Sequence, residues 1–365
     1  MDQNQYRDLI ASEDGGTIKK LAMCVLKAVS CGYAVGVSLR NIAYDIGLLR
    51  TYKPGAGVIS VGNITAGGTG KTPLVIWFSK YLAQKGASCA ILTRGYKAQP
   101  GKLTDEPAIL AKSCPAAQVV INVDRVAAAK KVIGEGSIDV FIMDDGFQHR
   151  RLGRDVDIIA VDATCPFGFG RLLPAGLLRE PVKSIKRADM VIITRSDQVD
   201  DSAIAEIEET IKKIAPQVPV AKSICCHPGA IAMKGHRLTM NELRRGKVFA
   251  FCGIGNPEAF VGQLGRCGMT LVGSKSYNDH HDYNVRDIAD IYEEAKYLGA
   301  NIILTTQKDW VKAALLIKGF EDIRFAYLEL ELEFTSGLDK IDELLQSFCP
   351  PEDVNHQTGQ NDESN

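Results

Sequence analysis

The chain has 365 residues, more than one compact core usually holds, so two domains of unequal size are expected. Its composition, 45% hydrophobic and 24% charged, excludes disordered, collagen-like and polytopic membrane proteins. The 43 Lys and Arg residues nearly balance 44 Asp and Glu residues, so no overall basic field attracts nucleic acid. Ten cysteines without a CxxC pair indicate reduced thiols in a cytosolic protein.

The first element is an apolar and basic segment, Thr17 to Lys53, which is predicted to be helical. Its longest uncharged run, Ala28 to Leu39, is shorter than the roughly 20 residues of a membrane-spanning helix. Lys27 interrupts the apolar stretch and no small-residue cleavage pattern follows, so a signal peptide is not expected. An interfacial helix and a core helix remain alternatives, and composition alone favours the core helix.

From Val58 onward, short apolar runs alternate with helical stretches, as in βαβ units with a mainly parallel sheet. The predicted strands are Val58–Val61, Cys89–Thr93, Gln118–Ile121, Val140–Met143, Ile158–Val161 and Met190–Thr194. A helix from about Ser202 to Ala215 closes this unit, which we predict as a P-loop nucleotide-binding domain over residues 54–220. Active-site groups should gather at the carboxyl ends of its strands.

Prolines after residue 215 interrupt the alternation of strands and helices, and we predict a linker over residues 221–246. A smaller α/β domain is predicted over 247–335, with strands at Lys247–Cys252 and Asn301–Thr305. The polar tail, 350–365, is predicted to be disordered. The expected fold class is therefore α/β: a P-loop-type, mainly parallel sheet domain with a second, smaller α/β domain.

The strongest motif is VGNITAGGTGKTP, Val61 to Pro73, which lies between a predicted strand and the amphipathic helix Leu74–Lys85. Its glycines let backbone N–H groups surround phosphate oxygens, Lys71 neutralises the β and γ phosphates, and the Thr72 hydroxyl binds Mg²⁺. The motif departs from the P-loop pattern at its first position, where Thr replaces Gly. The predicted nucleotide-binding residues are Thr65, Ala66, Gly67, Gly68, Thr69, Gly70, Lys71 and Thr72.

The second motif is the pair Asp144 and Asp145, which follows the apolar strand that begins at Val140. These carboxylates can hold Mg²⁺ directly or through water. A GTPase would place Asp three residues before Gly146, where this chain has Met143. Residues 194–197, Thr-Arg-Ser-Asp, differ from the guanine-reading Thr-Lys-x-Asp by Arg in place of Lys. A P-loop ATPase or GTPase switch that binds a protein partner is therefore only the alternative function.

Several motifs in order resemble the tetraacyldisaccharide 4′-kinases of lipid A biosynthesis, and together they extend to about residue 330. They are GNITAGGTGKTP at 62–73, LTRGYK at 92–97, DEP at 105–107, DDGFQHRRLGRD at 144–155, GRLLPAGLLREP at 170–181, GIGNPEAF at 253–260, DHHDY at 279–283 and QKDWVK at 307–312. The chain differs from the family pattern at Gln307, where Glu is usual.

The resemblance implies that the γ-phosphoryl group of ATP is transferred, with Mg²⁺ assisting, to the 4′-hydroxyl of a lipid A disaccharide 1-phosphate precursor. It implies Asp105 as the base and His280, from the second domain, as its partner, although periodicity does not separate His280 from His281. The implied metal-binding residues are Thr72, Asp144, Asp145 and Glu180. The implied substrate residues are Gln148, Arg151, Arg171 and Arg179, although a solvated surface explains the arginines equally well.

An acylated sugar does not readily leave a bilayer, so the enzyme implied by the resemblance works at a membrane surface. This makes residues 1–53 the predicted membrane-docking segment, peripheral (monotopic) to the cytoplasmic face of the bacterial inner membrane. No nucleic acid and no obligate protein partner are expected. A soluble small-metabolite kinase, with this helix in the core, is the remaining alternative.

Overall fold

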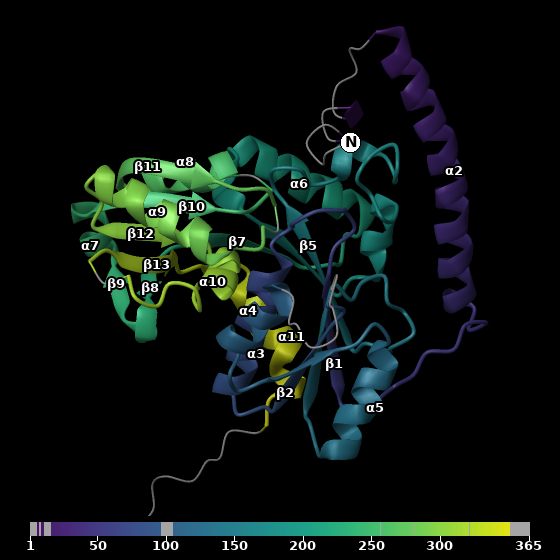
Figure 1. Cartoon of the computed structure of the whole chain (residues 1–365). Coiled ribbons are helices and arrows are strands. Elements are labelled where there is room, and N and C mark those ends of the chain that lie inside the picture. The colour runs from purple at the N-terminus through teal and green to yellow at the C-terminus, as the bar shows by residue number, and fades with distance from the viewer. Residues whose placement is uncertain are drawn as a thin grey trace, which may run out of the picture.

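The computed structural model describes residues 6, 9–10, 16–95, 105–255, 257–279, 281–320 and 322–350. Their secondary structure forms two sheets, each with helices on both faces (Figure 1). The α/β fold class predicted from the sequence is confirmed, because the alternation of apolar strands and helices builds mainly parallel sheets in both units.

The first sheet has eight strands in the order β14-β7-β6-β5-β1-β4-β2-β3. Neighbours are parallel except β14, which is antiparallel to β7. All six strands predicted before residue 195 occur within two residues of their predicted bounds, because buried parallel strands form continuous apolar runs. The strands are β1 (Gly57–Gly62), β2 (Cys89–Thr93), β3 (Gln118–Ile121), β4 (Val140–Asp144), β5 (Val156–Asp162), β6 (Met190–Thr194), β7 (Val220–Cys226) and β14 (Glu331–Ser336).

Helices cover both faces of this sheet. One face carries α3 (Lys71–Gln84), α4 (Asp105–Ser113) and α11 (Leu338–Leu345), whose apolar side chains share one core with the central strands. The opposite face carries α5 (Arg125–Glu135) and α6 (Asp201–Ile214). Each fully buried apolar side chain in these layers contributes roughly 1.5–3 kcal/mol by its removal from water.

The second sheet has the order β11-β10-β12-β13-β8-β9. Its strands are β8 (Gly229–Ala232), β9 (Arg237–Thr239), β10 (Lys247–Cys252), β11 (Thr270–Ser276), β12 (Ile302–Thr305) and β13 (Arg324–Leu328). Helices α7 (Met240–Arg245) and α8 (Pro257–Arg266) cover one face, and α9 (Val285–Tyr297) and α10 (Gln307–Ala313) cover the other. The short 3₁₀ helices are η1 (Gly168–Gly170), η2 (Val182–Arg187), η3 (Ser196–Gln198), η4 (Met233–Gly235) and η5 (Gln346–Phe348).

The predicted linker, residues 221–246, is wrong, since this stretch contains most of β7 together with β8, β9 and α7. The predicted end of the smaller domain at residue 335 is also corrected, because β14 pairs with the edge strand β7 of the first sheet. Phe334 of β14 packs edge-on against Trp77 of α3, with ring centroids 4.7 Å apart. The described chain therefore passes between the domains twice, and the prolines that suggested a linker only separate short strands.

The long helix α2 (Thr17–Asp45) extends along the first domain on the side away from the second (Figure 1). Several apolar side chains on it are more than half exposed: Leu21, Val25, Val29, Val35, Leu39 and Ile42. By length and composition, its portion Lys19–Asp45 could cross a membrane, and none of the apolar window in it is buried. A core position for this helix, which composition favoured, is therefore excluded.

Candidate functional site

The P-loop connects β1 to α3 at the carboxyl edge of the first sheet. Thr65, which replaces the expected Gly, is buried and forms an antiparallel bridge with Leu178. An extended residue needs no positive φ, so a β-branched side chain fits at this position. Gly67 and Gly70 do have positive φ, 120° and 77°, which explains why glycine occurs there.

The lysine of the P-loop belongs to a network of three charged side chains. Lys71 Nζ lies 3.3 Å from Asp145 Oδ1, and Arg179 Nη1 donates to Asp145 Oδ1 and Oδ2 at 3.0 and 2.8 Å. Burial raises the pKa of Asp145, but the charges of Lys71 and Arg179 outweigh it and hold that pKa below its usual range. An ionised carboxylate thus holds two cations beside the phosphate loop.

The preceding carboxylate, Asp144, lies in a different environment. It is 5% exposed and accepts a hydrogen bond from Thr93 Oγ1 at 3.0 Å. Burial, with the nearby charges of Asp145 and Glu106, raises the pKa of Asp144 to about 6. The two neighbouring carboxylates therefore differ in how readily they ionise near neutral pH.

Three of the four predicted metal-binding residues share the carboxyl edge of the sheet. Asp144 is in register with Val61 at the end of β1, Asp145 follows it, and Thr72 is the second residue of α3. Glu180 is fully buried instead against Asn41 and Arg187, whose side chains donate to its Oε2 at 2.8 Å. Within the described ranges, no three His, Cys, Asp or Glu side chains are grouped to hold a metal.

Of the predicted substrate residues, Arg179 belongs to the charged network at the P-loop. Gln148 Nε2 donates to Asn63 O at 2.8 Å, on the approach to the P-loop. Arg151 pairs with Asp124 at 3.2 Å and is largely exposed. Arg171 lies in the same segment as Arg179, and its carbonyl oxygen accepts a hydrogen bond from Leu178 N.

The predicted base, Asp105, is the first residue of α4. The charge of the adjacent Glu106 acts on Asp144, so the start of this helix lies near the end of β4. His280 lies outside the described residues. His281 Nε2 is 3.0 Å from Asp287 Oδ2 and its ring stacks on Tyr277, which ties this neighbouring histidine to the second domain.

The sequence interpretation missed Arg125, which is only 4% exposed. Its guanidinium donates to the carbonyl oxygens of Asn122, Val123 and Asp144, and thereby joins the ends of β3 and β4. Its Nε has no hydrogen-bond partner among the residues that the structure describes. Nothing local distinguishes a buried arginine at the start of a helix from a solvated one, so no sequence signal identifies it.

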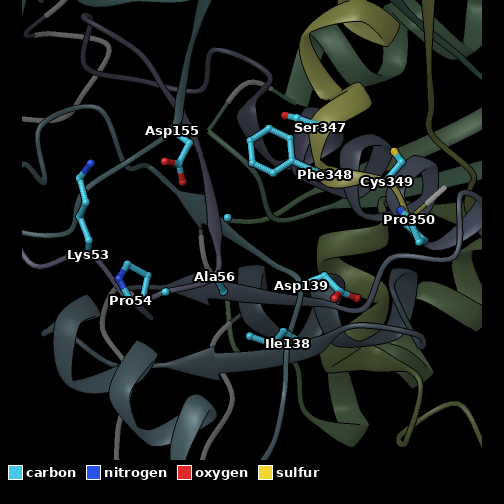
Figure 2. A pocket seen from close by; sticks show the side chains of 13 residues that line it. Lys53, Pro54, Ala56, Ile138, Asp139, Asp155, Ser347, Phe348, Cys349 and Pro350 are labelled. Atoms are coloured by element: carbon cyan, nitrogen blue, oxygen red, sulfur yellow. The ribbon is translucent and has the colours of Figure 1, made fainter.

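Two cavities lie apart from this charged network. One, of about 710 Å³, is at the amino ends of β1 and β4, with Gly57, Asp139, Asp155 and Phe348 in its lining (Figure 2). Another, of about 600 Å³, is lined by residues of both domains, among them Asp197, Cys225, Cys226, His227, Gln263 and Arg266. The first is at the sheet edge opposite the P-loop and does not belong to the phosphate site.

The family model described as tetraacyldisaccharide-1-P 4′-kinase matches residues 22–349. A tetraacyldisaccharide 4′-kinase of Halothermothrix orenii is 33% identical over 363 residues, covering 91% of this chain and 94% of that protein. Another, of Geobacter metallireducens, is 34% identical over 345 residues, covering 89% and 99%. The solved structure of LpxK from Aquifex aeolicus in complex with ATP has a TM-score of 0.72 and 28% identity, covering 90% of this chain and all of that one.

These matches extend over both sheets and confirm the resemblance that the motifs indicated. They also favour the kinase over a P-loop switch. With its P-loop, its paired carboxylates and these relatives, the chain belongs to the tetraacyldisaccharide-1-P 4′-kinase family.

Proposed function

We propose that this chain transfers the γ-phosphoryl group of ATP to the 4′-hydroxyl of a tetraacyldisaccharide 1-phosphate. The observation that carries the proposal is the network of Lys71, Asp145 and Arg179 at the P-loop. Phosphoryl transfer depends on positioning and on neutralising charge, which two cations beside a phosphate loop supply. The acceptor follows from family membership, since the relatives are named for it.

Residues 65–72 bind the triphosphate through backbone N–H groups and Lys71. Mg²⁺ would be held by Thr72, Asp144 and Asp145, and its charge would neutralise phosphate oxygens. The donor set fits this ion, because Mg²⁺ usually takes only one or two protein carboxylates beside waters and substrate phosphates. Glu180, the fourth predicted ligand, is paired with Arg187, so we assign it to the support of the site instead.

Asp105 accepts the proton of the acceptor hydroxyl as that oxygen bonds to phosphorus and the bond to the β-phosphate oxygen breaks. His280 is proposed as the partner of this carboxylate. The position of α4 near the end of β4 supports a base at this point. Arg179 holds anionic oxygens beside Lys71, and Gln148, Arg151 and Arg171 bind the acceptor.

The acceptor carries acyl chains, so the reaction takes place at a lipid surface, for which we propose the cytoplasmic face of the inner membrane. The exposed apolar side chains of α2 support a docking role for this helix. The helix lies on the interface plane and does not span the bilayer in this proposal. The protein is then peripheral, without an obligate protein partner.

The test is transfer of label from γ-labelled ATP to tetraacyldisaccharide 1-phosphate in mixed micelles. Lys71→Ala and Asp105→Ala should both abolish labelled lipid, and Asp105→Ala should still bind ATP. Lys80→Ala, which removes an exposed lysine from the same helix as Lys71, should match the wild type. Release of free phosphate without lipid product would instead indicate the switch alternative.

A further inference from the structure

Several polar side chains of the long helix α2 bind the body of the protein, and many of its apolar side chains are exposed. Ser30 Oγ donates to Leu172 O, and Tyr33 Oη donates to Arg179 O, both at 2.9 Å. Arg40 and Asn41 reach two further segments of the site. The helix with the exposed apolar residues is thus attached to the loops that carry the phosphate-binding groups.

Two hydrogen-bond chains begin at neighbouring residues of α2. Arg40 Nη2 donates to Gln148 O at 3.0 Å, and Gln148 Nε2 donates to Asn63 O at 2.8 Å. Asn63 Nδ2 in turn donates to Thr69 Oγ1 at 2.8 Å. This series of hydrogen bonds ends inside the P-loop.

The second chain begins at Asn41, whose Nδ2 donates to Glu180 Oε2 at 2.8 Å. Glu180 follows Arg179 directly, and the backbone N–H of Arg179 donates to Ile64 O at 2.7 Å. The side chain of Arg179 holds Asp145, which pairs with Lys71. This chain therefore reaches the same loop from its other end.

Of the residues in this hydrogen-bond chain, Glu180 is the most sensitive to the loss of a donor, because its carboxylate is fully buried. Burial raises its pKa, but the hydrogen bond and charge of Arg187 and the amide of Asn41 bring the net pKa below the usual range. A buried carboxylate that loses a donor must move or rehydrate. Either change shifts the backbone at Arg179, and catalysis is sensitive to displacements of about 1 Å.

We propose that Asn41 is a positioning residue for phosphoryl transfer: through Glu180, it holds Arg179 of the phosphate site in register with the outward-facing helix α2. The proposal rests on the proposed function. It links the position of α2 against the protein body to the geometry around Lys71. Displacement of the helix therefore lowers kcat even when ATP is bound.

The test compares Asn41→Ala and Asn41→Asp with Ser38→Ala, a matched removal of a polar side chain one turn away. Asn41→Ala should lower kcat roughly tenfold, with Kd for ATP and binding to vesicles of anionic phospholipid unchanged. Asn41→Asp keeps the size of the side chain but faces the carboxylate of Glu180, so it should lose at least as much. Ser38→Ala should match the wild type.

A double-mutant cycle separates positioning from folding. In an Arg179→Ala background, Asn41→Ala should have no further effect on kcat, because the group it positions is gone. Additive losses, or full activity of Asn41→Asp, would overturn the proposal in favour of a purely structural side chain. A wild-type protein that makes no labelled lipid would instead refute the proposed function, so the two failures are distinguishable.

Discussion

Lys71 and Asp145 form an ion pair with 3.3 Å between Nζ and Oδ1, and the same carboxylate accepts both hydrogen bonds from Arg179. The preceding residue, Asp144, is buried against Thr93, and the charge of Lys71 does not outweigh the effect of burial on its pKa. Two adjacent carboxylates at the end of one strand therefore have opposite pKa shifts. This contrast makes the stability of the fold depend on pH in a way that can be measured.

Asp144→Asn should stabilise the fold at neutral and higher pH. Because the pKa of Asp144 is raised to about 6 in the folded protein, the unfolded chain ionises more easily, and stability falls as the pH rises. The difference from the ordinary pKa of Asp corresponds to a gain of up to about 3 kcal/mol in the free energy of unfolding of the variant. Urea unfolding should show almost no gain at pH 4 and the full gain above pH 7.

Asp145→Asn is the matched control for this prediction. The folded pKa of Asp145 is lowered by its two cations, so its contribution is present above the unfolded pKa and lost on acidification. This variant should therefore be less stable than the wild type at neutral pH. The same sign of effect in both variants would contradict the assignment of their environments.

Arg187→Met should destabilise the protein strongly, because it removes the closer cation, at 2.8 Å, from the buried Glu180 and leaves only Arg40, at 3.9 Å. A loss of about 3–5 kcal/mol in the free energy of unfolding is expected. The double variant Glu180→Gln with Arg187→Met should recover most of this loss, since neither charge then remains. Additive losses in urea unfolding would show that packing of Arg187 over the Phe147 ring, 4.3 Å away, dominates.

Thr65→Gly, which restores the usual P-loop residue, should destabilise the protein without improving ATP binding. Thr65 is buried and extended against Leu178, so glycine adds only freedom to the unfolded chain and removes packed atoms. The expected cost is about 1 kcal/mol. Unfolding and nucleotide titrations measure both quantities, and tighter ATP binding by the glycine variant would refute this account.

Leu39→Ser should weaken binding to phospholipid vesicles roughly tenfold, because the exposed leucine on α2 would no longer enter the lipid. The control is Leu315→Ser, which removes a leucine that is 76% exposed on the second domain. Vesicle sedimentation should separate the two variants. Equal binding by both would remove the support for docking through α2.

The sequence alone determined six of the eight strands of the first sheet, the P-loop and the carboxylates at the end of β4. These features depend on short-range patterns: apolar runs long enough for one strand, glycines where φ is positive, and polar residues at a strand end. The family resemblance rested on the same local motifs. Such patterns can be recognised without knowing how the chain folds in three dimensions.

Only the tertiary structure decided which distant segments meet. The pairing of β14 with β7 joins residues about a hundred positions apart, and Asn41 meets Glu180 across 139 positions. Likewise, no sequence pattern singled out Arg125, and Glu180 was predicted as a metal ligand, whereas the fold buries both among other protein groups. Burial and long-range partners set the pKa values and the supporting contacts of the site, because desolvation depends on what packs around a group and not on its neighbours in sequence.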